Sequence, residues 1–247
     1  MPARITPLRL EAFEQLPKHA RRCVFWEVDP ATLGREDHLS DPEFEKEAWL
    51  SMVMLEWGSC GQVAVLCPEG LSDEDAATDP SVEEPCVGYA FYAPPRAVPR
   101  ATLFPTGPVS PDAILLTTVG VEPGDDAADL PNTLLTSVVG DLVRRGVRAL
   151  EAFGRTAAAA ELLDPRVVPA DLVPVVEALG ECSVHQCMID ADFLEDVGFT
   201  VVAPHQYFPR LRLELEQGLG WKAGVEAALE RLLESAQLPV GAGSGRY

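Results

Sequence analysis

Two apolar runs with a helical segment between them, over residues 113–153, constrain the fold of this chain most strongly. Residues 114–121 are apolar and rich in β-branched side chains, which predicts a strand buried on both faces. Residues 131–145 carry apolar side chains at helical spacing and are followed by Gly146, a typical helix-ending residue. Residues 147–153 predict a second strand. This order predicts a right-handed βαβ unit, whose helix N-terminus is a place where anions often bind.

The rest of the chain predicts short strands and capped helices around this unit. Further strands are expected at residues 4–8, 61–66, 86–92, 199–203 and 210–215. Asp41 and Asp190 are expected to cap a helix that reaches Trp57 and a short helix that ends before Gly198. Apolar residues gather near one face of the first of these helices: Phe44, Ala48, Met52 and Leu55.

Domain organisation follows from the same patterns. Residues 1–216 are expected to form one domain, with an insertion at about residues 155–186. Residues 217–238 contain an amphipathic helical pattern that could dock on the domain or on a partner, and it offers an interface for a homodimer. Residues 239–247 are Gly-rich and are expected to form a flexible tail.

Composition narrows the range of partners. The chain has 247 residues, of which 47% are apolar, an ordinary value for a globular protein with a core. Its formal net charge of −20 opposes binding to nucleic acid or to an anionic membrane, but not to a basic protein or an amine. The sequence shows no signal peptide and no apolar run of the length that a membrane helix needs. We therefore expect a cytoplasmic protein with reduced thiols.

The six cysteines form no C-x-x-C pair. Cys182 and Cys187 lie near His185, but they lack a second pair of ligands at a spacing usual for zinc. The sequence therefore predicts no metal site.

From residue 86 to residue 215 the chain resembles the GCN5-related N-acetyltransferase (GNAT) superfamily, whereas residues 1–85 match it only loosely. Five residues match motif A of that superfamily, namely Val121, Pro123, Leu134, Leu135 and Gly146. Residues 193–199 are similar to its F-Y-E-K-x-G-F signature, and residues 207–215 to its closing strand. The resemblance implies an α/β (α+β) fold: a mixed, mostly antiparallel central sheet with splayed central strands, flanked by helices.

The resemblance also implies a site for acetyl-CoA. By position, the backbone N–H groups of Val119 and Val121 would meet the pantetheine and acetyl groups. The pyrophosphate would meet the backbone of the following loop, made of Asp126, Ala127, Ala128, Asp129, Leu130, Pro131 and Asn132. Such a loop binds an anion through backbone donors and the positive end of the helix dipole.

This loop departs from the superfamily pattern. Asp126 stands where an Arg or Gln is usual, Asp129 and Pro131 stand at two glycine positions, and Asp125 adds a third carboxylate. Each carboxylate at about 6 Å would oppose a pyrophosphate charge by about 0.7 kcal/mol at the dielectric of water and by about 3 kcal/mol at an effective dielectric of 20. Pro131 removes a donor. Alternatively, Asp129 simply caps the helix, which leaves the question of coenzyme A binding open.

The catalytic groups of the superfamily are only partly matched. Its usual general acid, a tyrosine, falls at Leu194, which leaves Tyr207 and Cys187 as substitutes, although each could be structural. Glu27 and Glu56 are the candidate bases, and Glu27 is either a buried acid in the acceptor pocket or a solvent-facing residue. Its neighbours Phe25 and Trp26 are expected in the core or in a pocket wall.

Two functions remain open. The first is an acetyl-CoA-dependent N-acetyltransferase, in which a small-molecule or protein amine attacks the thioester directly in a ternary complex. The second is a catalytically degenerate protein of the same fold that binds or regulates a partner without coenzyme A.

Overall fold

The computed structural model describes residues 3–29, 41–66, 85–124, 129–163, 166, 168–170, 172, 173, 176 and 187–215. Several predictions fall outside these residues: the helix expected within residues 217–238, the tail at 239–247 and much of the insertion at 155–186. The loop residues Asp125, Asp126, Ala127 and Ala128 also lie outside them.

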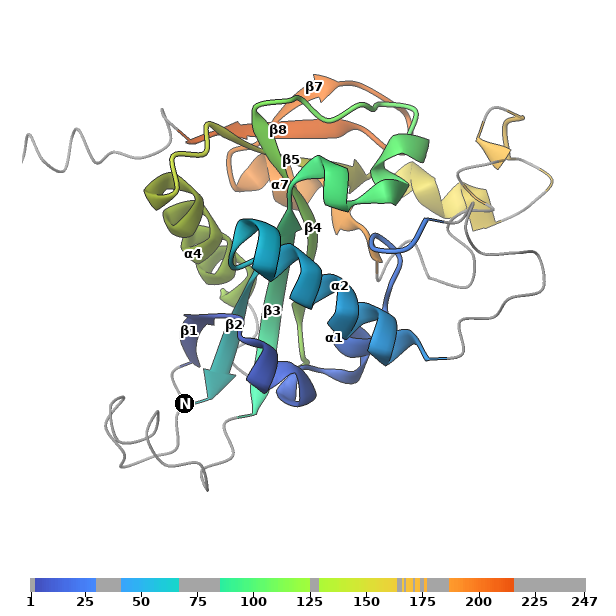
Figure 1. Cartoon of the computed structure of the whole chain (residues 1–247). Helices are drawn as coiled ribbons and strands as arrows, with labels where there is room; N and C mark the ends of the chain where they lie inside the picture. The colour runs from blue at the N-terminus through green and yellow to red at the C-terminus, as the bar shows by residue number, and fades with distance from the viewer. Residues whose placement is uncertain are drawn as a thin grey trace, which may run out of the picture.

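A mixed, mostly antiparallel sheet forms the centre of the molecule (Figure 1). Its strands are β1 (Ala3–Pro7), β2 (Gly61–Leu66), β3 (Cys86–Ala93), β4 (Ala113–Val121), β5 (Ala149–Arg155), β6 (Ile189–Asp190), β7 (Thr200–Ala203) and β8 (Arg210–Glu214). Their order is β1-β2-β3-β4-β5-β8-β7, and β6 pairs with β5 beside this path. Among the strands of the described residues, only the β4–β5 and β5–β6 pairs are parallel. Each predicted strand is present, whereas β6 was not predicted.

Helices surround this sheet. They are η1 (Leu10–Gln15), α1 (Lys18–Arg22), α2 (Pro42–Trp57), η2 (Pro95–Ala97), η3 (Pro99–Leu103), α4 (Leu130–Arg144), η4 (Ala157–Leu163) and α7 (Ala191–Asp196). The caps predicted at Asp41 and Asp190 are confirmed, because the Asp41 carboxylate accepts the N–H of Phe44 at 3.1 Å and Asp190 caps α7. Gly146 has a φ of 72° after α4, as a helix-ending glycine should. In the described part of the chain, no helix has the length and apolarity that a membrane span requires.

The core has two halves, one on each face of the sheet. Helices α1 and α2 cover one face (Figure 1), where Trp26 packs against Phe104 and Phe153, which also stack on each other. Helices α4 and α7 cover the other face with a separate apolar cluster. Neighbouring strand residues alternate between the two clusters, since successive side chains of a strand point to opposite faces. The expected burial of Phe25 and Trp26 is confirmed.

The apolar face expected on α2 does not point inward. Phe44, Met52 and Leu55 are exposed, with Leu55 at 85%. The buried face of α2 is instead formed by four other residues: Lys46, Trp49, Leu50 and Val53. Lys46 can occupy this face because its charge is paired within the core, and a pairing of this kind is not visible in the helical pattern.

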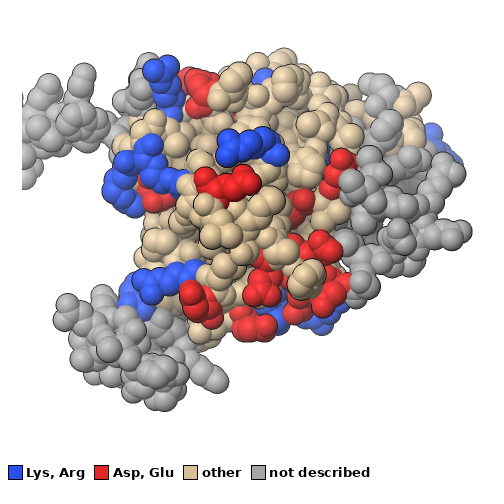
Figure 2. All heavy atoms as spheres, in the orientation of Figure 1, with Lys and Arg blue, Asp and Glu red and all other residues tan. Residues whose placement is uncertain are grey.

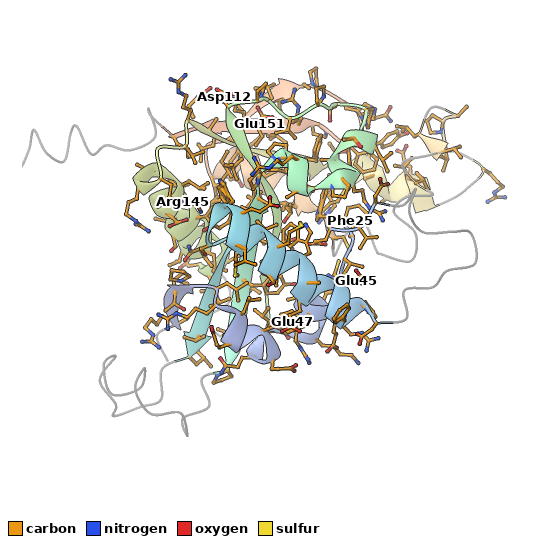
Figure 3. The ribbon with its side chains drawn as sticks, viewed as in Figure 1. Phe25, Glu45, Glu47, Asp112, Arg145 and Glu151 are labelled. Carbon is orange, nitrogen blue, oxygen red and sulfur yellow. The ribbon has the colours of Figure 1, made fainter. Side chains whose placement is uncertain are left out.

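Two polar clusters hold the sheet and helices in register (Figure 3). At the end of α4, Arg145 donates to the carbonyls of Trp57 and Ser59 at 2.6 and 2.7 Å, which fastens α4 to the end of α2. At the other end of the sheet, the fully buried Glu151 of β5 pairs with Arg210 and Arg212 of β8.

The two central strands splay apart. Strands β4 and β5 pair in parallel only over Ala113–Leu115, although β4 continues to Val121 and β5 to Arg155. A bulge interrupts the pairing of β3 with β4 between Phe91 and Tyr92, at the point where the separation begins. The predicted fold class, a mostly antiparallel sheet with splayed central strands and flanking helices, is confirmed.

Candidate active site

The edge of β4 that faces the splay carries backbone donors that point away from β3. Glu122 donates its N–H to Val87 of β3 at 2.8 Å, and residues of an antiparallel strand alternate in the direction of their N–H groups. Val119 and Val121 therefore point their N–H groups away from β3, into the gap that β5 leaves. Their pairing register with β3 places them opposite Ala90 and Gly88. The structure thus puts these two predicted residues where a ligand with an amide chain could extend the sheet.

The N-terminus of α4 lies directly after this strand in the chain. Its first residues are Leu130, Pro131 and Asn132, of which Pro131 has no N–H to donate. Asp129 precedes the helix but its side chain makes no capping hydrogen bond, so the prediction that it caps α4 is wrong. The reason is local: Asp129 has helical backbone angles, φ −95° and ψ −6°, whereas a capping residue is typically extended. Its exposed carboxylate thus remains at the positive end of the helix.

A groove runs beside this helix end. It has a volume of about 420 Å³ and lies between α4, the end of α7 and the end of β8. Asn132 and Thr136 line it on the α4 side, and Asp196 and Glu214 line the opposite side. The groove is large enough for part of an elongated ligand, and its described charged residues are acidic.

A second, much smaller cavity of about 10 Å³ lies on the other face of the sheet, beside α1 and α2. Its lining includes Thr118 of β4 together with Glu27 and Lys46, which form a buried ion pair. The second carboxylate oxygen of Glu27 accepts the N–H of Trp26 at 3.1 Å. Glu27 is therefore buried, and the interpretation as a solvent-facing residue is wrong. The Lys46 ammonium also lies 4.5 Å from the centre of the Phe91 ring, a favourable cation–π contact.

The other candidate catalytic residues are not gathered around this cavity. Glu56 lies at the surface near the end of α2, with its carboxylate 3.9 Å from the Arg96 guanidinium. Tyr207 is buried, and its hydroxyl donates to Glu161 at 3.4 Å. Burial and the Glu161 charge raise the pKa of Tyr207, so its phenol keeps its proton.

Cys187 differs from its expected state. It is disulfide-bonded. A cysteine in a disulfide has no thiol proton, so Cys187 cannot act as the predicted general acid in this state. The expectation that the thiols are reduced is likewise wrong at this residue.

His19 is a polar side chain in this region that sequence reasoning missed. It lines the small cavity, and its Nε2 atom is buried without a hydrogen-bond partner among the described residues. Burial lowers the pKa of His19, and the Lys46 charge lowers it further, so the imidazole is neutral. No local motif marks it, because its neighbours in space come from distant parts of the sequence.

Acidic side chains gather on the surface over η1 and the first half of α2 (Figure 2). The exposed members are Glu11, Glu14, Glu45 and Glu47. Arg21 lies among them and pairs with Glu14 and Glu43 at 3.1 and 3.0 Å. This acidic surface is on the same side of the sheet as the small cavity, and its charge suits a cationic molecule.

No family model matches the chain, and no curated protein matches it. Solved structures similar to it include a protein from Desulfovibrio desulfuricans described as a GNAT-family acetyltransferase, with 15% identity, a TM-score of 0.38 and coverage of 86% of this chain and 99% of that one. PaiA N-acetyltransferase from Thermoplasma acidophilum, in complex with coenzyme A, has 12% identity and a TM-score of 0.43, and the match covers 87% of this chain and 99% of that one. Ribosomal-protein-alanine N-acetyltransferase from Brucella melitensis has 15% identity and a TM-score of 0.42, and the match covers 85% of this chain and 99% of that one.

Because all three TM-scores lie below 0.5, these similarities add no detail to the site. The features that identify the fold belong to the chain itself: the parallel β4–α4–β5 unit, the splay of its two strands and the antiparallel strands on either side. Four motif residues lie where the resemblance requires them. Val121 ends β4, Leu134 and Leu135 are buried on the inner face of α4, and Gly146 follows the C-terminus of this helix. The chain has the fold of the GCN5-related N-acetyltransferases.

Proposed function

We propose that the protein is an acetyl-CoA-dependent N-acetyltransferase that acts on a small-molecule or protein amine. The observation that carries this proposal is the open edge of β4, where Val119 and Val121 direct N–H groups into the splay beside the N-terminus of α4. Such an edge can hold the amides of a pantetheine chain, as a neighbouring strand would. The helix end that follows suits an anion through the N–H groups of Leu130 and Asn132.

In the proposed reaction the amine attacks the thioester carbonyl directly. A carbon–nitrogen bond forms, the carbon–sulfur bond breaks, the amine loses a proton and the departing thiolate gains one. A backbone N–H group of β4 would stabilise the negative oxygen of the tetrahedral intermediate.

Among the candidate bases, the arrangement favours Glu27 over Glu56. Glu27 shares a cavity with Thr118 of the splayed strand and forms an ion pair with Lys46, whereas Glu56 lies at the surface. Among the candidate acids, Tyr207 has a proton to donate and Cys187 in its disulfide does not. We therefore propose Glu27 as the base, and Tyr207 remains the candidate acid although it does not line the cavity of Glu27.

The acidic surface over η1 and α2 supports a cationic acceptor. Most amines are protonated at neutral pH, so this surface would raise their local concentration near the cavity. Because the effect is long-range, it should weaken as salt shortens the Debye length from about 30 Å at 0.01 M to about 8 Å at 0.15 M.

A second function, a binding protein of this fold that does not use coenzyme A, is favoured by two observations. The exposed Asp129 carboxylate and the missing N–H of Pro131 both oppose a pyrophosphate at α4. The cavity beside Glu27 and Lys46 is only about 10 Å³, too small for an acceptor without rearrangement. Direct measurement of acetyl-CoA binding separates the two functions.

Two substitutions test the proposed site. Val119→Pro removes one N–H donor, and Val119→Ala is its matched control, because alanine keeps the donor and loses only side-chain atoms. With one hydrogen bond worth about 0.5–1.5 kcal/mol net, Val119→Pro should weaken acetyl-CoA binding about 2- to 13-fold relative to Val119→Ala. Circular dichroism must show that both variants are folded.

Asp129→Asn provides a test by gain of affinity. If a pyrophosphate binds about 6 Å from this carboxylate, its removal should strengthen binding about 3-fold at the dielectric of water and up to about 100-fold at an effective dielectric of 20. Calorimetry measures the affinities, and release of the free thiol of coenzyme A with a panel of amines measures turnover. Equal affinities for the wild type and all three variants would contradict the proposed site, and no binding to the wild type would favour the second function.

A further inference from the structure

Three side chains that can ligate a metal ion converge beside the small cavity, although they come from two distant parts of the sequence. His19 lies in α1 and Cys23 follows one helical turn later, while Cys187 lies just before β6. One ligand atom from each of the three lies within 4.8 Å of the others. The Sγ atoms of Cys23 and Cys187 are 3.6 Å apart.

These distances fit a tetrahedral zinc ion. With Zn–S bonds of about 2.3 Å and Zn–N bonds of about 2.0 Å, two sulfur ligands lie about 3.8 Å apart, and a sulfur and a nitrogen about 3.5 Å apart. The Sγ–Sγ distance of 3.6 Å is already close to that value. The widest separation within the group, at most 4.8 Å, would need to close by roughly 1 Å, which side-chain rotation can supply.

The imidazole supplies an independent observation. The Nε2 atom of His19 is buried and has no hydrogen-bond partner among the described residues. A buried polar atom without a partner is costly, and bonding to a metal ion would remove that cost. Soft thiolate ligands combined with an imidazole favour zinc over magnesium or calcium, which prefer oxygen ligands.

The backbone around the three side chains is fixed. The N–H of Cys23 donates to the carbonyl of His19 at 2.8 Å, which sets these two residues one turn apart. The indole N–H of Trp26 donates to the carbonyl of Cys187 at 3.1 Å, in the core. The two segments that carry the ligands are therefore held together before any ion binds, which lowers the entropy that binding must overcome.

The charges also balance. Two thiolates and a neutral imidazole around Zn²⁺ have no net charge, which suits a largely buried place. Glu27 and Lys46, which line the same small cavity, form an ion pair that is neutral overall. The sequence predicted no metal site because Cys182 and Cys187 lack a second pair of ligands nearby in the chain. In the folded protein, His19 and Cys23 lie beside Cys187 and supply such a pair.

We propose that His19, Cys23 and Cys187 bind one Zn²⁺ ion when the Cys187 disulfide is reduced, with water at the fourth position. A dithiol reductant supplies two electrons and two protons and becomes a disulfide itself, which leaves two protein thiols, one of them on Cys187. Zinc then binds as Cys23 and Cys187 each lose a proton, and His19 binds through a neutral nitrogen. The ion links α1 to β6 beside the cavity, and oxidation of Cys187 removes one of its ligands. This inference is independent of the proposed acetyltransferase activity.

Cobalt(II) binding to the full chain tests the site directly. In protein kept reduced with a phosphine, Co²⁺ should give thiolate-to-cobalt charge-transfer absorption and the intense visible bands of a tetrahedral ion, with one equivalent bound and displaced by Zn²⁺. Protein whose disulfide is intact should show neither signal. His19→Gln, Cys23→Ser and Cys187→Ser should each weaken Zn²⁺ binding by more than about tenfold, since even residues that only support metal ligands cost 10- to 100-fold.

Cys86→Ser is the matched control. Cys86 is also a buried thiol, but it donates to the carbonyl of Gly88 and belongs to no ligand group of the described residues. It should bind Zn²⁺ like the wild type. The proposal is overturned if reduced wild type shows no thiolate-to-cobalt band, or if Cys23→Ser and His19→Gln, shown to be folded by circular dichroism, bind as tightly as Cys86→Ser.

Discussion

The ion pair between Glu27 and Lys46 is the feature whose removal should affect stability most. The side chains are 1% and 3% exposed, so neither charge can be solvated if the other is removed. Breaking such a buried pair from one side typically costs about 3–5 kcal/mol, because it leaves an uncompensated charge in the core. At about 2–4 °C per kcal/mol for a chain of this size, Lys46→Met should lower Tm by about 6–20 °C. Glu27→Gln should have an effect of similar size.

The double variant Glu27→Gln/Lys46→Met provides the sharper test. It removes both charges together, so it should cost less than the sum of the two single variants by about 1–3 kcal/mol. Urea unfolding followed by the fluorescence of Trp26 and Trp49 measures all four free energies. The exposed pair of Arg96 and Glu56 serves as the control, because surface pairs contribute only about 0–1 kcal/mol. Additive losses, or single losses no larger than those at the surface pair, would refute the reasoning.

Two further predictions concern the central strands. Burial alone would raise the pKa of Glu151, but hydrogen bonds from Ser110, Arg210 and Arg212 outweigh it and lower the pKa. Ionised Glu151 therefore stabilises the fold above its unfolded pKa, near 4.3, and this stabilisation is lost as pH falls through the lower pKa of the folded state. Glu151→Gln should remove this dependence, so the fall in stability below about pH 4 should be less steep in the variant than in the wild type. Gly120→Ala would bring a Cβ within 2.4 Å of the Tyr89 ring, and such overpacking should cost about 1–3 kcal/mol in urea unfolding. An unchanged acid limb, or a Gly120→Ala variant as stable as the wild type, would contradict these two predictions.

Much of the fold could be predicted because its signals are local. The β-branched run of β4, the spacing of Leu134 and Leu135 and the glycine at 146 each act within a few residues of chain, and the structure confirms the elements that they predict. The caps at Asp41 and Asp190 are equally local, since a side chain there bonds a backbone N–H two or three residues away.

Of the candidate site, only the part formed by backbone N–H groups could be predicted from the sequence. Val119 and Val121 act through their N–H groups, whose direction follows from strand pairing. The buried position of Glu27 could not be predicted, because it depends on Lys46 from another helix. The grouping of His19 and Cys23 with Cys187 arises in the same way, from two segments that the fold brings together. Asp129 fails as a cap because of its backbone angles, which its side-chain type does not reveal.

Thermal stability with and without acetyl-CoA tests the central proposal most directly. A ligand at 100 times its Kd stabilises the folded state by about 2.7 kcal/mol, which for a chain of this size raises Tm by about 5–10 °C. The proposed acetyltransferase should show this shift at sub-millimolar acetyl-CoA, and Asp129→Asn should show it at a lower concentration. No shift at several millimolar acetyl-CoA would contradict the account and favour a binding protein that uses the same fold without coenzyme A.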